Sequence, residues 1–202
     1  MSLETWDARR KKWQLYTSTE AQAADARRHP FDRVPRRIFL DTNVVNRLVD
    51  HAETIFQGLP PRTGLTPNRS DEVEALTHVF QISARAGWEI LGSATSLEEI
   101  GDTPHPEQRE ALLEYAVHLV DLPSGETRRA QAIAESGLLS ALPDAADRRL
   151  LAEAIGLGCD VFCTCDRRTI INRREALPGL PLDVLLPQEW WARVKPWGGL
   201  WL

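Results

Sequence analysis

Acidic side chains at the ends of apolar segments are the residues of this chain that could do chemistry. Asp41 and Asp166 each end a short apolar run, and Glu99 and Asp147 fall in the first turns of two predicted helices. The carboxyl ends of parallel strands meet at one edge of a sheet, where open α/β sheets bind ligands. We therefore expect Asp41, Glu99, Asp147 and Asp166 to converge.

Each acid also has an ordinary structural explanation. Asp41 could be the N-cap of the following helix, and Asp166 could be a turn residue. The patterns Ser96-x-x-Glu99 and Asp144-x-x-Asp147 could be capping boxes. Four acids that all reach one edge need a further reason, because gathered like charges repel and raise each other's pKa unless a cation lies among them.

A hard divalent cation is the natural partner of such a group. Carboxylate oxygens without histidine or cysteine favour Mg²⁺ or Mn²⁺ over zinc. These ions bind phosphate oxygens and lower the pKa of a bound water, which then acts as a nucleophile. The acids therefore predict metal-assisted hydrolysis of phosphodiesters.

Two of the four positions have a neighbour that could replace them. Glu98 is adjacent to Glu99, and Asp144 could share or take over the role of Asp147. We favour Glu99 because a serine stands three residues before it and an isoleucine follows it.

Apolar patterning predicts alternating strands and helices that position these acids. The expected strands are 37–40, 88–94, 117–122, 160–166 and 182–186. The expected helices are 44–56, 70–87, one from 95, 106–116, one around 128–129, 143–155 and 187–193. An irregular loop is expected at 58–70. Strands that alternate with helices imply right-handed crossovers and a mostly parallel sheet.

Composition restricts the class of protein. A chain of 202 residues with 43% hydrophobic side chains can bury one α/β core plus a modest extension. No apolar run approaches the roughly 20 residues that span a bilayer, so we expect a cytoplasmic protein without membrane contact. Three cysteines around one expected strand argue against a disulfide framework, and the histidines lack zinc-ligand spacing.

Charge divides the chain unevenly. Residues 1–37 carry nine Lys/Arg against five Asp/Glu, whereas the rest carries fifteen against twenty-four. We predict a basic, partly helical N-terminal extension at 1–35, a nuclease domain at 36–195 and a tail at 196–202. The extension could contact nucleic acid or an acidic partner, although a solvated terminus is the commoner case.

Four motifs in order resemble the PIN-domain ribonucleases, which include the toxins of bacterial VapBC-type toxin–antitoxin pairs. They are Ile-Phe-Leu-Asp41-Thr-Asn43, Ser-Ala-Thr-Ser-Leu-Glu-Glu99-Ile, Asp147-Arg-Arg-Leu-Leu-Ala-Glu-Ala154 and Asp160-Val-Phe-Cys-Thr164-Cys-Asp166. The similarity covers about 37–192, including a last strand and helix in Leu-Asp-Val-Leu-Leu-Pro-Gln-Glu-Trp-Trp. It implies a PIN-like, open, mostly parallel five-stranded sheet of order 3-2-1-4-5 with helices on both faces.

The resemblance also implies a function. It implies Mg²⁺-dependent cleavage of RNA, with the acids named above as catalytic metal ligands and Asn43 and Thr164 as supporting polar groups. Besides RNA, the expected partners are a cognate antitoxin and a second copy of the chain in a homodimer. The chain is longer than a compact toxin of this family because of its basic extension and the loop at 58–70. A nuclease that acts alone in RNA processing or defence is therefore kept as an alternative function.

Cations outside the acidic pocket must contact the substrate. The candidates near the acid-bearing elements are Arg128, Arg129, Arg148, Arg167 and Arg168. Solvated helix faces explain most such arginine pairs.

Other functions fit less well. A phosphoacceptor receiver domain needs a lysine near the pocket, and the only lysines are Lys11, Lys12 and Lys195. A haloacid-dehalogenase-like phosphatase needs two aspartates two residues apart, where this chain has Asp41-Thr-Asn43. A silent PIN-like RNA-binding or scaffold module would leave unneutralised acids that repel RNA phosphates.

Overall fold

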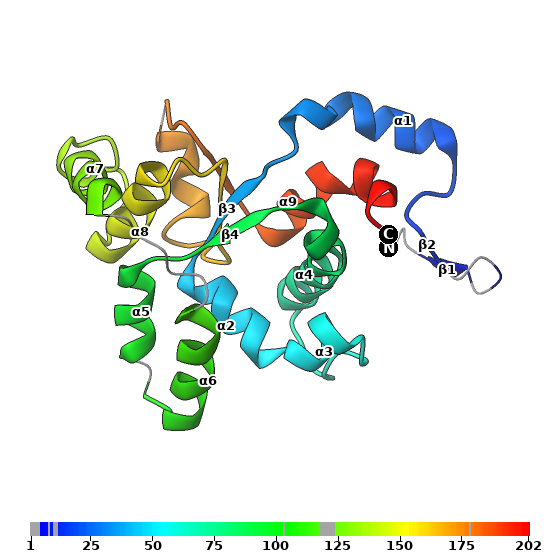
Figure 1. Cartoon of the computed structure of the whole chain (residues 1–202), viewed down its shortest axis with the longest axis horizontal. Helices are drawn as coiled ribbons and strands as arrows, with labels where there is room; N and C mark the ends of the chain where they lie inside the picture. Colours follow the sequence, from blue (N-terminus) through cyan, green and yellow to red (C-terminus); the bar gives the residue numbers. More distant parts are fainter. Residues whose placement is uncertain (1–4, 8, 10–11, 103, 118–123, 178) are drawn as a thin grey trace.

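A four-stranded parallel sheet lies at the centre of the protein (Figure 1). The computed structural model describes all residues except 1–4, 8, 10–11, 103, 118–123 and 178. The strands are β3 (Arg37–Leu40), β4 (Glu89–Leu91), β5 (Val161–Cys163) and β6 (Asp183–Leu185). They lie in the order β4-β3-β5-β6, and each neighbouring pair is parallel.

This order agrees with the prediction for four of its five strands. The described sheet has four strands rather than the five predicted, and the predicted third strand falls mainly on 118–122, outside the described residues. Val117, where that strand was expected to begin, is the last residue of a helix. The sheet is thus a parallel α/β sheet with β3 and β5 as its central neighbours.

Helices cover both faces of the sheet, as Figure 1 shows with α7 and α8 on one side and α4 and α9 on the other. The α-helices are α1 (Thr19–Arg28), α2 (Thr42–Asp50), α3 (Ala52–Gln57), α4 (Pro67–Ala86), α5 (Ala94–Gly101), α6 (Pro106–Val117), α7 (Ser124–Glu135), α8 (Ala145–Gly156) and α9 (Pro187–Val194). Short 3-10 helices are η1 (Phe31–Arg33), η2 (Ile171–Ala176) and η3 (Lys195–Leu200). Among the described residues, none of these helices is long and apolar enough to cross a membrane.

The strands bury side chains on both faces. Phe39 and Phe162 stack with ring centroids 5.5 Å apart in the core against α8. Ile38, Leu40 and Val161 point into the opposite core, which contains residues of α2, α4 and α9. Burial on both sides explains why the first strand reads as a continuous apolar run without alternation.

Two helix starts differ from the prediction because capping residues lie earlier. Helix α4 begins at Pro67 rather than 70, since Thr66 is the N-cap and its hydroxyl accepts a hydrogen bond from the Arg69 amide. Helix α5 begins at Ala94, where Ser93 caps by accepting from the Ser96 amide at 3.2 Å. The strand predicted at 88–94 is therefore shorter, and ends at Leu91 as β4.

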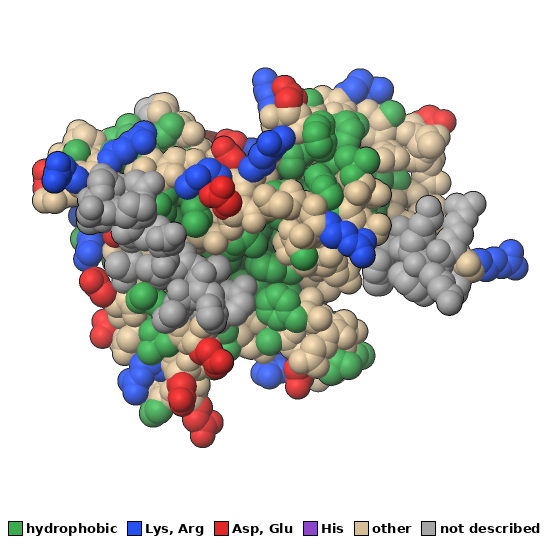
Figure 2. All heavy atoms as spheres, in the orientation of Figure 1, with side chains coloured by type: hydrophobic (Ala, Val, Ile, Leu, Met, Phe, Trp, Pro, Cys, Tyr) green, Lys and Arg blue, Asp and Glu red, His purple; other side chains and the backbone are tan. Residues whose placement is uncertain are grey.

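The two ends of the chain contact each other. A hairpin of β1 (Thr5–Asp7) and β2 (Lys12–Gln14), which was not predicted, precedes α1, and α1 confirms the expected helical part. Gln22 donates to the Pro196 carbonyl at 2.9 Å, and the Trp197 indole donates to the His29 carbonyl at 2.8 Å. Hydrophobic side chains are visible on the surface around η3 (Figure 2). The domain limits at 35 and 195 stay predictions.

Candidate functional site

Asp41 follows β3 and occupies the N-cap position of α2, yet its side chain makes no capping hydrogen bond. Its Oδ2 instead accepts from the Thr164 hydroxyl at 2.5 Å and from the Asn43 amide at 2.6 Å. Only 3% of the residue is exposed. Helix capping therefore does not explain this buried carboxylate.

Asn43 and Thr164 join the ends of the two central strands. The Asn43 side-chain oxygen accepts from the Cys165 amide at 2.7 Å, while its nitrogen donates to Asp41. The Thr164 hydroxyl accepts from the Asp166 amide at 2.9 Å. The segments after β3 and β5 are thus held around the Asp41 carboxylate by neutral donors.

Glu99, rather than Glu98, lies at this edge. Its Oε2 accepts a hydrogen bond at 2.5 Å from the hydroxyl of Thr42, the residue that follows Asp41. Glu98 faces outward, with its side chain 64% exposed and an ion pair to Arg149 at 3.4 Å. The alternative explanation of Ser96-x-x-Glu99 as a capping box does not hold, because Ser93 is the N-cap of α5.

The other two acids come from the start of α8 and the turn after β5. Asp144 is the N-cap of α8 and accepts from the Ala146 amide at 2.7 Å, so its capping role is confirmed. Asp147 lies in the first turn of α8. Asp166 is a turn residue whose two oxygens accept from the Thr169 amide at 2.8 Å and the Thr169 hydroxyl at 2.6 Å.

The acids act on one another electrostatically. Burial raises the pKa of Asp41 to about 7, and the charges of Glu99 and Asp147 add to this against the hydrogen bond from Thr164. Burial also raises the pKa of Glu99, with Asp147 adding to the rise, and the pKa of Asp147, with Asp144 and Asp166 adding to it. We call Asp41, Glu99, Asp147 and Asp166 the acidic edge.

The donor chemistry of the acidic edge fits a hard divalent cation, because every ligand atom is a carboxylate oxygen. Within the described residues, no ion pair neutralises any of the four acids. In the same part of the chain, however, no three carboxylate, imidazole or thiol side chains stand close enough to hold one metal ion. Joint ligation would require these side chains to move closer together, so the expected convergence is partial.

Sequence reasoning missed several polar partners of the acids. The hydroxyl groups of Thr42 and Thr169 donate hydrogen bonds to Glu99 and Asp166. The only sequence signal that could have indicated these threonines is that each lies within three residues of an assigned acid. Glu153 of α8 was also missed. Its Oε1 accepts from Thr95 at 2.7 Å, its Oε2 is buried without a partner among the described residues, and its charge helps to raise the pKa of Glu99.

The predicted substrate-binding arginines are dispersed. Arg128 and Arg129 are exposed on α7. Arg148 donates to the carbonyls of residues 142 and 143, at 2.6 and 3.1 Å, in the loop before α8. Arg167 forms an ion pair with Glu72 at 3.4 Å, and Arg168 is exposed.

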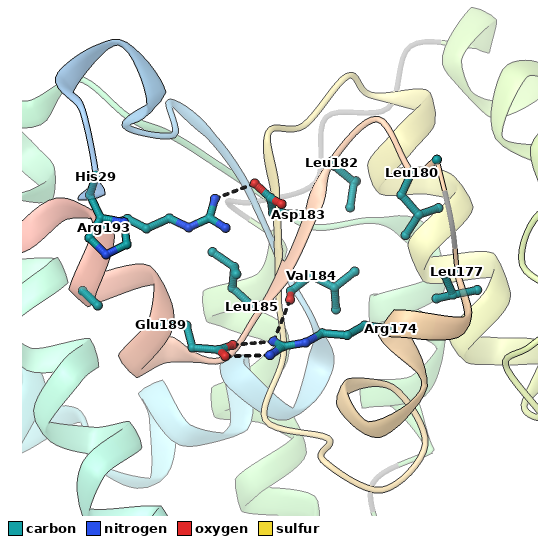
Figure 3. A pocket seen from close by; sticks show the side chains of 12 residues that line it. His29, Arg174, Leu177, Leu180, Leu182, Asp183, Val184, Leu185, Glu189 and Arg193 are labelled. Carbon is teal, nitrogen blue, oxygen red and sulfur yellow. Dashed lines mark hydrogen bonds and ion pairs between the residues drawn. The ribbon is translucent and has the colours of Figure 1, made fainter. Parts of the chain in front are cut away.

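A separate hollow of about 530 Å³ lies beside β6, and none of the four acids lines it (Figure 3). Arg174 donates to both oxygens of Glu189, at 2.6 and 2.8 Å, and to the Val184 carbonyl at 3.2 Å. Arg193 donates to Asp183 at 2.5 Å. We call this region, with its two ion pairs, the β6 hollow.

Comparisons with known proteins give one structural match. The sequence matches no protein-family model and no curated protein. Among solved structures, it aligns with the crystal structure of VapBC2 from Rickettsia felis bound to a DNA fragment from their promoter. The alignment has 13% identity and a TM-score of 0.42, and covers 74% of this chain and 98% of that chain.

Proposed function

We propose that this protein is a Mg²⁺- or Mn²⁺-dependent endoribonuclease that hydrolyses RNA phosphodiesters at the acidic edge. The observation that carries the proposal is the Asp41 carboxylate, which stands at a helix N-cap position without capping and is held by Thr164 and Asn43. It is buried beside other acids, and no described cation pairs with it. Such an arrangement is costly without a role. RNA as substrate rests on the resemblance to the PIN-domain ribonucleases.

The residues of the acidic edge would divide the work. Asp41, Glu99, Asp147 and Asp166 would hold the ion through carboxylate oxygens. A bound Mg²⁺ supplies a water of lowered pKa and stabilises negative charge on phosphate oxygens. Asn43 and Thr164 keep the Asp41 carboxylate in one orientation, and Thr42 does the same for Glu99. Polar groups that orient ligands typically contribute about 10- to 100-fold in affinity or activity.

A cleavage assay tests the proposal. The wild-type protein should cleave single-stranded RNA with Mg²⁺ and lose activity in EDTA, and Asp41→Asn should be inactive under both conditions. Asp144→Asn is a matched control, because Asp144 caps α8 and asparagine is an equally good N-cap. Cleavage by Asp41→Asn at the wild-type rate, in a preparation free of contaminating nuclease, would remove the proposed catalytic centre.

We further propose that a small inhibitor protein controls the enzyme, as in a toxin–antitoxin pair. A hollow of about 360 Å³ lies between α3, α4 and the loop at 58–61, and Leu59 of its lining is 48% exposed. An amphipathic helix could bury leucines there. An arginine of the inhibitor would satisfy carboxylates of the acidic edge. The predicted homodimer stays a prediction.

Expression in a bacterial host separates a toxin from a nuclease that acts alone. Wild type should arrest growth, Asp41→Asn should not, and co-expression of the neighbouring reading frame should restore growth. Harmless overexpression of a protein that cleaves RNA in vitro would contradict the toxin proposal and keep the nuclease.

A further inference from the structure

A third hollow, of about 530 Å³, opens beside the acidic edge, between α2, the start of α4 and the turn after β5. Asn43 and Asp166, which belong to the network around Asp41, form part of its lining. Its other charged lining residues are Arg47, Arg69, Glu72, Arg167 and Arg168. We call this hollow the arginine groove. Only Arg167 and Arg168 among these arginines were expected from the sequence to contact substrate.

Glu72 orients two of the arginines from beneath. Its side chain is only 4% exposed, and its two oxygens accept from Arg47 Nε at 3.3 Å and from Arg167 Nη2 at 3.4 Å. Each guanidinium carries five N–H donors and spends one of them on Glu72. The remaining donors of Arg47 and Arg167 have no partner in the described part of the chain, and the Arg167 Nε is buried.

The other two arginines are available in different ways. Arg69, in the first turn of α4, is held by Asp50 at 2.7 Å and by His51 Nε2 at 3.2 Å, with its side chain 35% exposed. Arg168 is exposed and has no partner among the described residues. Thus three guanidinium groups are pre-positioned, which lowers the entropy lost when they bind an anion.

The charge of the groove is unbalanced. Four arginines face three acids, Glu72 and Asp166 of the lining and Asp50, which pairs with Arg69, and two guanidinium groups share the single buried carboxylate of Glu72. An anion of the solution could satisfy the unused donors, because guanidinium groups bind phosphate oxygens with charge-assisted hydrogen bonds. One small anion would occupy a pair of arginines, whereas four arginines along one hollow suit several phosphates in a row.

We infer that the arginine groove binds the phosphodiester backbone of a nucleic-acid strand, at the phosphates next to the one that lies at the acidic edge. This inference rests on the proposed function and names the path of its substrate. The strand would run over α2 and the start of α4, away from Arg128 and Arg129 on α7. The arginines would offset the repulsion between the substrate phosphates and the acids.

A binding experiment in EDTA tests the groove without any cleavage. The probe is a short fluorescein-labelled single-stranded RNA, titrated with the full-length protein and followed by fluorescence anisotropy at several salt concentrations. The pair Arg47→Gln and Arg167→Gln should raise the Kd by about tenfold or more. It should also make the slope of log K against log salt shallower by about 1.4, since each phosphate contact on a single strand contributes about 0.7.

Three further variants separate binding from folding. The matched control pair Arg85→Gln and Arg173→Gln removes the same charge from exposed positions outside the groove, and should change Kd by less than about twofold. Arg168→Gln has no internal partner to lose, so it should weaken binding with an unchanged melting temperature. Glu72→Gln should tighten binding, because two arginine charges lose their buried counter-charge; a purely structural Glu72 would lower stability without tightening binding.

The outcomes distinguish this inference from the nuclease proposal. Loss of binding in the groove variants supports the groove even if no condition produces cleavage. Equal losses in the groove and control pairs, or loss only in Arg128→Gln with Arg129→Gln, would overturn it. A DNA strand of the same sequence shows whether RNA or DNA supplies the phosphates. Binding of either strand supports the groove. If neither strand binds more tightly than free pyrophosphate, the inference is overturned.

Discussion

In the β6 hollow, the charged side chains neutralise each other. Hydrogen bonding to Glu189 raises the pKa of Arg174, and for Glu189 burial is outweighed by hydrogen bonds from Arg174 and the Leu186 amide, so its pKa falls. At the acidic edge, burial raises the pKa of Asp41 to about 7 and neighbouring acids add to the rise. Ion pairs that keep both partners charged can stabilise a fold by themselves. Acids that repel each other cannot, which is why we propose an external cation for the acidic edge and none for the β6 hollow.

The largest expected difference between the two regions is in cleavage. Asp41→Asn should reduce RNA cleavage by about a hundredfold or more, because the proposed metal site would lose a ligand. Folding should persist, since both hydrogen bonds end on Oδ2 and the amide oxygen of the substitute can keep them. Asp183→Asn is the matched change in the β6 hollow, and should leave the cleavage rate unchanged. Similar rates for the two variants would remove the distinction between the regions.

The pH dependence of stability should have opposite signs in the two regions. The Asp41 pKa is raised from 3.8 to about 7, so its contribution to the free energy of unfolding is present below about 4 and lost as pH rises through about 7. The loss should amount to a few kcal/mol, since one pKa unit corresponds to about 1.4 kcal/mol. Glu189, with a lowered pKa, should instead stabilise the fold above its unfolded pKa and lose this effect in acid.

Urea unfolding in EDTA between pH 4 and 8 measures the Asp41 effect, and extending the series to pH 2 measures the Glu189 effect, which lies below about pH 4.5. Wild type should become less stable between about pH 4 and 7, and Asp41→Asn should flatten this decline. A decline of equal size in Asp41→Asn would show that another group causes it.

A smaller effect is expected from breaking the bidentate pair of the β6 hollow. Arg174→Gln should lower the free energy of unfolding by roughly 1 kcal/mol, because both partners are about one third exposed and solvent screens the pair. Urea denaturation at pH 7 gives the value. The cleavage rate should not change, and a large loss of cleavage in a folded Arg174→Gln protein would assign this hollow to the active site.

The smallest effect should come from changing Glu98, which is adjacent to Glu99 of the acidic edge but faces away from it. Glu98→Gln removes an exposed ion pair with Arg149 and should keep cleavage within about twofold of wild type. Glu99→Gln is the internal comparison and should reduce cleavage by at least tenfold, because it changes a half-buried group of the acidic edge. The reverse ranking would exchange the roles of the two glutamates.

The positions of the acids could be predicted because each depends on local patterns. Asp41 and Asp166 follow short buried strands, and parallel strands must present their carboxyl ends on one edge. The choice of Glu99 over Glu98 agrees with the side chain that faces Thr42. Their spacing could not be predicted, because hydroxyl donors such as Thr169 hold the acids individually, and a threonine in a loop carries no distinctive signal.

Features made by distant segments escaped sequence reasoning. Arg47, Glu72 and Arg167 meet only because α2, α4 and the turn after β5 pack together, so no local pattern indicates the arginine groove. The start of α4 was placed at 70 because the serine there resembles a cap, whereas Thr66-Pro67 supplies a cap and a favoured first residue. The hairpin of β1 and β2 was missed because strands of three residues are too short to show alternation.

The contact between the two ends of the chain has a consequence for the order of folding during synthesis. Leu15 is buried against the last turns of the protein, and a side chain on Gly198 would come within 2.8 Å of its Cδ1. A growing chain folds from its N-terminus. The strands that carry the acidic edge, β3 and β5, precede η3 in the sequence, so α1 must wait until η3, its docking surface, has been made. A chain released before η3 has been made would therefore leave α1 without its docking surface.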